Sequence, residues 1–460
     1  MANTDPGQRS VAMPPPEHSP QPTEPLVDLT AHPEAEAALV PPQIVAQTLR
    51  EYFRGQWLRI RGGESGILPV LLALIVITVV FEAISPRHIF LRADNVVNLF
   101  QQSTYFIVFA MAEIFVLLLG DIDLSIGYVG PIGGVIAVQL VQPATTGWPW
   151  WGAILAALTA CALIGAAQGT LITRLRLPSF IVTLGGLLIF NGVLLIVLGF
   201  GPFSGYPSLN GRSPNLRALF DLMWGHVTPL QGWVAMGVIV GGMAVYMYLR
   251  DSRRRRSGLV APPTSLTIIK IVLLAAAGIV VVAECNVNRA ASGSSLRGVP
   301  WAIFIVLGVF ALWTFLLQRT RYGRYLYAIG GNAEAARRAG INVNAVRTFA
   351  FVLCAMTAGI AGLLYASYLG GMSNNVPGGS LVLYAVAGAV IGGTSLFGGR
   401  GKAAHGVLGG LVIGGIYNGI YLLGLQVEYQ FIVTGGVLIG AVMVDALSRR
   451  NSASSGTPGV

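Results

Sequence analysis

The chain has 460 residues, of which 54% are hydrophobic and only 10% are charged, and its mean hydropathy is +0.68. A soluble domain carries a charge on about a quarter of its residues, so this composition excludes an ordinary soluble protein and indicates an integral membrane protein. The net charge of +10 does not indicate a nucleic-acid partner, because membrane proteins retain Lys and Arg on their cytoplasmic loops.

The N-terminal residues 1–49 are rich in proline, alanine, serine and acidic side chains. They lack a basic stretch followed by an apolar core, so they do not form a signal peptide, and we expect a disordered cytoplasmic tail. Four arginines, at positions 50, 54, 59 and 61, come directly before the first apolar run and place the N-terminus in the cytoplasm. The membrane domain is expected over 50–449, and residues 450–460 are expected to form a second disordered tail.

Apolar runs near the length of about 20 residues that crosses a bilayer recur along the rest of the chain. They predict an all-α polytopic membrane protein with about twelve transmembrane helices (ten to twelve). The predicted spans are 67–84, 103–119, 125–142, 150–172, 180–199, 231–249, 267–284, 301–317, 346–369, 381–396, 405–423 and 429–446. Twelve crossings from a cytoplasmic N-terminus place the basic clusters at 174–176, 253–256, 319–338, 400–402 and 449–450, and the C-terminus, on the cytoplasmic side.

The run 103–142 is interrupted by the sequence GDIDLSIG at 120–127, so a broken or re-entrant helix is an alternative to two full crossings there. Acidic groups at membrane depth are costly and mark function unless they are capped. Asp123 and Ser125 fit an N-cap of the following helix, and the same break fits the lining of a translocation path. Glu113, inside the preceding run, is harder to explain as a cap; it faces either a polar cavity or an interface.

A second polar break, IGGTSLFGGRGK at 391–402, also follows an apolar run and precedes a glycine-rich apolar helix. The likeness of the two breaks suggests two pseudo-repeated halves. Gly401-Lys402 is not a phosphate-binding loop, because Leu396 stands where that loop needs glycine and Ala403 where it needs Ser or Thr. No nucleotide motif appears elsewhere, so an ATPase, if one powers this protein, is a separate chain. The cysteines Cys161, Cys285 and Cys354 are scattered, and we expect no metal and no cofactor.

The long polar interruption at 321–341, RYGRYLYAIGGNAEAARRAGI, predicts a short cytoplasmic helix that begins after the N-cap Asn332 and ends at Gly340. Alanines between these caps permit close approach by another protein. Docking of a partner on this segment is one hypothesis, and a solvated loop that only links two spans is the other.

Four motifs carry a resemblance to a known family. YGRYLYAIGGNAEAARRAGI at 322–341 resembles the cytoplasmic coupling segment of the ribose/xylose/galactose-type permeases of ATP-binding-cassette (ABC) transporters. GDIDLSIG at 120–127, LPSFIVTLGGLLIFNGV at 177–193 and IGGTSLFGGRG at 391–401 resemble further signatures of that family, in the right order over 65–448. The basic loop at 253–256 and the extra hairpin at 267–317 resemble the xylose type most.

The resemblance implies a permease subunit of a bacterial inner-membrane importer of a monosaccharide, D-xylose or a related pentose. It implies a homodimer, a cytoplasmic ABC ATPase that hydrolyses ATP in place of this chain, and an extracytoplasmic sugar-binding protein. The expected ATPase-coupling residues are Tyr322, Gly323, Gly330, Gly331, Asn332, Glu334, Ala335, Ala336, Arg337 and Gly340. The expected substrate-path residues are Asp121, Asp123, Ser125, Thr183, Asn191, Thr394 and Ser395.

An ATP-independent channel or secondary sugar transporter is the alternative function. A membrane-embedded enzyme is disfavoured, because the sequence contains no catalytic pair or metal set.

Overall fold

The computed structural model describes residues 68–199, 207–258, 261–290 and 295–454, and within these ranges the chain is helical with no strand beyond two isolated bridges. The predicted tail 1–49 and the four arginines after it lie outside the described residues. The elements are α3 (Leu68–Ile84), the 3-10 turn η1 (Pro86–His88), α4 (Ala93–Leu117), α5 (Ile126–Leu140), α6 (Trp150–Arg174), α7 (Ser179–Gly199), α8 (Pro214–Trp224), α9 (Pro229–Arg256), α10 (Thr264–Asn286), α11 (Trp301–Arg319), α12 (Arg321–Gly331), α13 (Ala333–Arg338), α14 (Val343–Leu369), α15 (Gly378–Ile391), α16 (Ala403–Leu422) and α17 (Val427–Ser454).

Every predicted span overlaps one of these helices, although the span 381–396 runs five residues past the end of α15, and this agreement confirms the all-α polytopic fold. Eight described helices are long and apolar enough to cross a membrane, and four apolar stretches are shorter: α3, α5, α15 and the part of α17 from Val427 to Gly440. The 15 residues of α5 and the 14 of α15 reach only about 22 Å at 1.5 Å per residue, against about 30 Å of hydrocarbon. The irregular region expected at 103–142 is therefore one long helix, α4, followed by one short helix, α5.

Two boundaries differ from the sequence-based expectation for physical reasons, and one helix was not predicted. Helix α4 begins at Ala93 rather than 103, because its polar first turns, with Asn95, Gln101 and Gln102, are buried against other helices. Helix α9 continues through the basic run 253–256, where the C-terminal end of the helix dipole favours cations. Between the predicted spans 180–199 and 231–249 lies the amphipathic helix α8, which buries Leu216, Leu219 and Met223.

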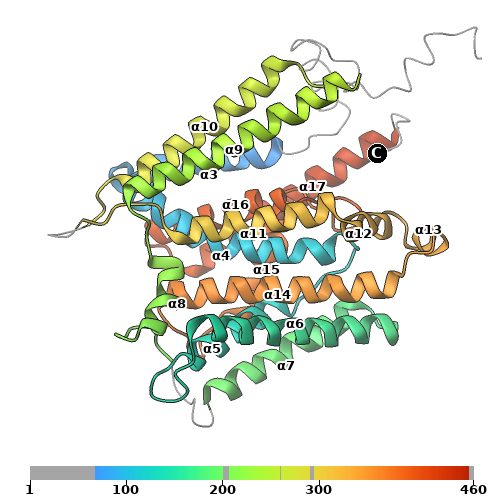
Figure 1. Cartoon of the computed structure of the whole chain (residues 1–460). Coiled ribbons are helices and arrows are strands. Elements are labelled where there is room, and N and C mark those ends of the chain that lie inside the picture. Colours follow the sequence, from blue (N-terminus) through green and yellow to red (C-terminus); the bar gives the residue numbers. More distant parts are fainter. Residues whose placement is uncertain (1–67, 200–206, 259–260, 291–294, 455–460) are drawn as a thin grey trace, which may run out of the picture.

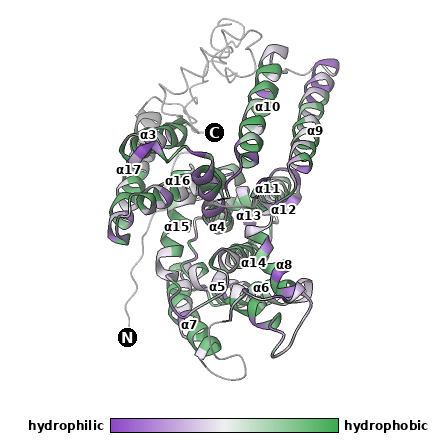
Figure 2. Ribbon diagram, turned by 90° about the vertical axis from the view of Figure 1, so that its left-hand side faces the viewer, coloured by the Kyte–Doolittle hydropathy of each residue, from purple (hydrophilic) through white to green (hydrophobic). Residues whose placement is uncertain are grey.

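A central group of helices, α4, α5, α14, α15 and α16, forms the core, and the other helices surround it (Figures 1 and 2). Small residues allow close approach inside this group: a Cβ added at Gly409 of α16 would lie 1.6 Å from the carbonyl oxygen of Gly388 in α15. Helices α9 and α10 pair with each other and stand apart from the rest in Figure 2, with apolar outer faces. Lipid or a second copy of the chain is the natural cover for such faces in a membrane protein.

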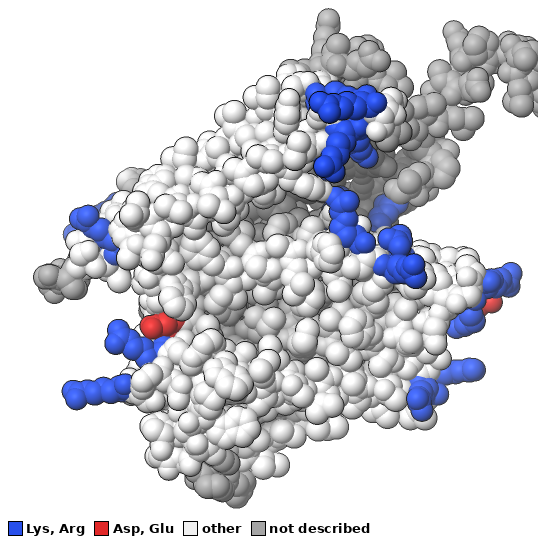
Figure 3. Space-filling model, in the orientation of Figure 1, with Lys and Arg blue, Asp and Glu red and all other residues white. Residues whose placement is uncertain are grey.

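The two ends of the helix bundle differ in character. At the end marked by α8, the loops at 207–210 and 370–372 bond to each other, with Leu209 donating to the carbonyl of Gly370 (2.9 Å). At the other end, the α12–α13 end, the chain turns at two polar breaks, residues 118–125 (the first break) and 392–402 (the second break). Lys and Arg gather at this end and at the tip of α9, and a smaller set lies at the opposite end of the bundle (Figure 3), so the α12–α13 end is the more basic of the two.

Candidate coupling and translocation site

The predicted coupling segment forms two helices, α12 and α13, rather than one. The expected caps are present: Asn332 Oδ1 accepts the backbone N–H of Ala335 (2.9 Å), and Gly340 adopts the left-handed conformation (φ 82°) that ends α13. Helix α12, which the sequence did not separate, begins after Thr320, whose hydroxyl accepts the N–H of Gly323 (3.2 Å). Local capping chemistry therefore sets the geometry of the whole segment.

Helix α13 is an exposed knob, since Ala336 alone of its six residues is buried. Glu334 pairs with Arg337 (2.8 Å) and Arg338 (3.4 Å) along the same helix, with all three side chains more than half exposed. Exposed pairs of this kind contribute little to stability. These charges are thus available to a partner at small energetic cost.

Helix α12 is amphipathic and packs inward through three residues, Gly323, Leu326 and Ile329, while Arg321 and Arg324 face outward. Its last turn contacts both polar breaks at one point. A Cβ at Gly330 would lie 1.8 Å from the carbonyl oxygen of Leu118 in the first break and 2.6 Å from the N–H of Gly399 in the second. We call this contact of Gly330, Leu118 and Gly399 the backbone junction.

Two hydrogen bonds close the backbone junction. Gly399 donates its N–H to the carbonyl of Leu118 (2.9 Å), which ties one break to the other. Tyr327 of α12 donates its hydroxyl to the carbonyl of Gly401 (2.7 Å), and burial raises the pKa of this phenol, which keeps it protonated as a donor. Helix α12 therefore contacts the first break at Leu118 and the second break at Gly399 and Gly401. By contrast, a Cβ at the predicted coupling residue Gly331 would meet nothing within 4 Å.

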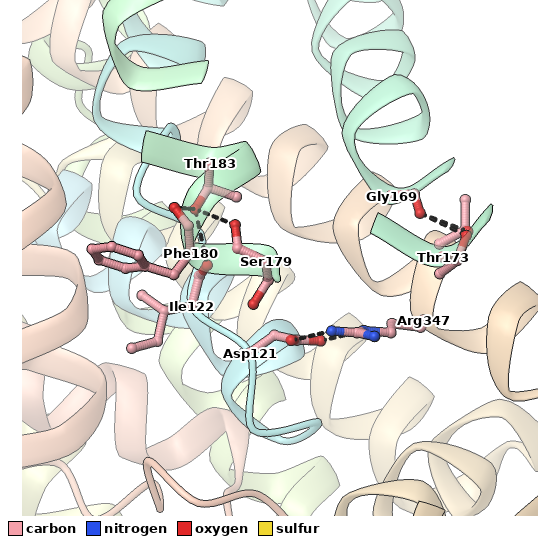
Figure 4. Close-up of polar contacts among 9 residues, drawn as sticks. Asp121, Ile122, Gly169, Thr173, Ser179, Phe180, Thr183 and Arg347 are labelled. Atoms are coloured by element: carbon pink, nitrogen blue, oxygen red, sulfur yellow. Dashed lines mark hydrogen bonds and ion pairs between the residues drawn. The ribbon is translucent and has the colours of Figure 1, made fainter. Parts of the chain in front are cut away.

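The first break is held by an ion pair that the sequence reasoning missed. Asp121 accepts two hydrogen bonds from Arg347 at the start of α14, Nε–Oδ2 at 2.6 Å and Nη2–Oδ1 at 2.5 Å (Figure 4). The carboxylate is buried and the guanidinium is 30% exposed. A lone arginine at the edge of an apolar run was the available signal, because such charges pair with one another.

Behind this ion pair lies a fully buried polar chain. Glu113 Oε1 accepts the N–H of Asp123 (3.0 Å), and Asp123 Oδ1 accepts the N–H (2.9 Å) and hydroxyl (2.6 Å) of Ser125 at the start of α5. Gln168 of α6, also missed from the sequence, donates to the Ser125 hydroxyl (3.0 Å). Asp123 thus closes the turn before α5 and does not cap the helix, because the N-cap residue Ser125 has no side-chain cap hydrogen bond; the expected N-cap role of Asp123 and Ser125 is wrong. Glu113 faces this polar interior.

The remaining predicted path residues divide between the two breaks. Thr183 of α7 donates to the carbonyl of Ile122 (3.2 Å), which fixes α7 to the first break (Figure 4). In the second break, the Thr394 hydroxyl lies 3.3 Å from Nδ1 of His405, and the Ser395 hydroxyl accepts the N–H of Phe397 (3.1 Å). Asn191 lies apart, two turns or about 12 Å along α7 from Thr183.

Comparison with known protein families matches residues 95–442 to the family described as "Branched-chain amino acid transport system / permease component". The chain belongs to this family of permeases. The match covers the core helices, both breaks and the coupling segment, so the site described above lies within the family's common structure.

Curated relatives of this permease include sugar permeases. The chain is 32% identical to the xylose transport system permease protein XylH of Escherichia coli (strain K12) over 398 residues, 85% of this chain and 96% of that one. It is 29% identical to the ribose import permease protein RbsC of the same organism (86% and 96% covered) and 29% identical to its D-allose transport system permease protein AlsC (81% and 90% covered). These matches confirm the resemblance to monosaccharide permeases that the four motifs indicated. No solved structure matches this permease.

Proposed function

We propose that this permease is the membrane subunit of an ABC importer that translocates a monosaccharide, D-xylose or a related pentose. The xylose permease named above supports this choice, because it is similar to the chain over nearly its whole length. ATP hydrolysis resides in a separate cytoplasmic ATPase, and an extracytoplasmic binding protein delivers the sugar. Two copies of the chain form the pore in the bacterial inner membrane.

The observation that carries this proposal is the backbone junction. An ATPase that grips the exposed helix α13 also moves α12, and α12 touches both polar breaks through Gly330. Both short helices, α5 and α15, adjoin these breaks. ATP-driven motion of the ATPase therefore reaches the polar interior without a signal through flexible side chains.

The path itself is proposed to follow the polar groups of the two breaks, Asp121, Asp123 and Ser125 in the first and Thr394 and Ser395 in the second. Thr183 and Asn191 are proposed to extend this lining along α7. Sugar passes without being held tightly, because a tightly bound solute does not leave a transporter at a useful rate. The α12–α13 end and both termini are assigned to the cytoplasm, where basic residues are retained.

The coupling role is tested by Glu334→Trp and Ala335→Trp, which place a bulky ring on the exposed knob. We expect both variants to fold and to lose ATP-dependent uptake in the reconstituted complex. Leu188→Trp on α7 is the control, because this side chain is also exposed, on an apolar helix distant in sequence from the knob. Normal uptake in the knob variants, with normal assembly of the complex, would refute the docking role.

The alternative function, an ATP-independent channel or secondary transporter, predicts sugar flux in liposomes that contain this chain alone. The proposed function predicts none without the ATPase. Uptake of labelled pentoses and hexoses by the whole complex then identifies the sugar, and a preference for a hexose over D-xylose would overturn the pentose assignment.

A further inference from the structure

Five tyrosines from four core helices gather between the middle of α4 and the α8 end. The ring centroid of Tyr105 lies 5.3 Å from that of Tyr365 and 5.6 Å from that of Tyr368, both on α14. Tyr384 of α15 and Tyr417 of α16 join through Phe106, whose ring lies 5.6 Å and 5.5 Å from theirs. The phenol of Tyr417 is close enough to the other four to interact electrostatically. We call these five residues the tyrosine cluster.

A chain of buried amides borders the tyrosine cluster. Asn95 and Asn418 exchange hydrogen bonds (2.9 and 3.1 Å), and Asn418 also donates to Gln102 Oε1 (3.0 Å). Gln102 in turn donates to the hydroxyl of Tyr368 (3.0 Å). The amides therefore continue directly into the phenols, and one connected polar network runs through α4, α14 and α16.

The phenols are not required for packing. Phe106, with no hydroxyl, packs its ring against Tyr384 and Tyr417, so phenylalanine rings would supply the same apolar contact. The side chains of Tyr365 and Tyr384 are only 8% and 6% exposed, and their hydroxyls form no hydrogen bond within the described part of the chain, yet neither hydroxyl is among its fully buried polar atoms without a partner. These two hydroxyls can therefore bond a solute that reaches the tyrosine cluster. A bound solute that supplies the missing hydrogen bonds accounts for this arrangement.

The chemistry of the cluster selects the class of solute. No member of the tyrosine cluster or of the amide chain is charged, so the ligand is neutral. Aromatic rings offer apolar faces, while phenols and amides both donate and accept hydrogen bonds. A small polyol with one C–H-rich face fits this combination. On the function proposed above, we infer that the tyrosine cluster and its amides form a monosaccharide-recognition site within the permease itself.

The site has access to the surface at α16. Tyr421 lies one helical turn beyond Tyr417 on the same helix face and is 70% exposed, while Tyr417 and Tyr368 are half-buried. Tyr368 also stacks on Trp224 of α8, with centroids 5.8 Å apart and planes at 12°. Sugar entering from the α8 end would thus meet the tyrosines before it reaches the two polar breaks, which gives the permease a selection step of its own.

The variants Tyr384→Phe and Tyr417→Phe test this inference, because each removes a hydroxyl and keeps the ring. Tyr248→Phe is the matched control, on a tyrosine of α9 that is 56% exposed and outside the cluster. The first measurement is saturation-transfer NMR of D-xylose, D-ribose and D-allose with the purified full-length permease in lipid nanodiscs. We expect transfer to the sugar C–H protons in wild type and control, weakened about fivefold or more in both cluster variants.

The second measurement is uptake of the same sugars by the reconstituted complex. We expect both cluster variants to change the ratio of the three uptake rates while ATP hydrolysis and the thermal midpoint match the control. If the wild-type permease binds sugar but the complex transports none, the recognition site stands and the proposed function fails. If the complex transports sugar while binding and the uptake ratio are unchanged in both cluster variants, the recognition site is refuted and the proposed function stands.

Discussion

The backbone junction makes a sharp prediction for Gly330→Ala. The added methyl carbon would lie 1.8 Å from the Leu118 carbonyl oxygen, whereas ordinary contact begins at 3.4 Å. The last turn of α12 must therefore retreat from the breaks by about 1.6 Å, the difference between those distances, and overpacking of this kind costs about 1–3 kcal/mol. Loss of the Gly399–Leu118 hydrogen bond would add about 1 kcal/mol.

Gly331→Ala is the matched control, since its methyl group would meet nothing within 4 Å. The assay compares both variants in the reconstituted complex, by ATP hydrolysis stimulated by the sugar-loaded binding protein and by sugar uptake. We expect Gly330→Ala to lower the thermal midpoint and to lose most of the uptake per ATP hydrolysed, while Gly331→Ala behaves as wild type. The reasoning fails if the two variants are indistinguishable in both assays.

Three further predictions concern single side chains. Asp121→Asn leaves the Arg347 guanidinium without its partner and should destabilise the protein by about 2 kcal/mol. Adding Arg347→Gln should recover part of this stability in thermal denaturation in detergent, and no recovery would contradict the pairing. Glu113→Gln keeps an acceptor for the Asp123 N–H and should be tolerated, whereas Glu113→Leu should lower the free energy of unfolding by about 1–3 kcal/mol. Equal thermal midpoints for the two variants would show that this buried hydrogen bond is dispensable. Burial and the nearby Arg289 lower the pKa of His226, so the folded state binds fewer protons than the unfolded state and stability falls as the pH drops through about 6.5. The thermal midpoints at pH 5 and pH 7.5 should therefore differ less in His226→Gln than in wild type. An unchanged difference would show that His226 does not cause this pH dependence.

Features with local causes could be predicted from the sequence. Asn332 precedes the start of α13 and Gly340 follows its end, as expected, because a helix cap needs only one side chain or one left-handed residue within a turn of the helix end. The twelve apolar runs likewise gave the helices, since the bilayer sets their composition and approximate length.

Features that depend on distant partners could not be predicted. Arg347 is 226 positions from Asp121, and nothing in either local sequence specifies the pair. The polar start of α4 resembles a loop until Asn95 meets Asn418 from α16. The grouping of the five tyrosines also depends on how four helices pack, which periodicity alone does not give.

A contact between side chains can be repacked, because a smaller residue on one surface can be matched by a larger residue opposite. The contact of Gly330 with Leu118 and Gly399 is made by the main chain, so no substitution on the other side can make room for a larger residue at Gly330. A larger side chain at Gly330 must break this contact. On the coupling proposed above, residues elsewhere in the bundle set the choice of sugar and this contact sets the linkage to the ATPase, so the two properties can change independently.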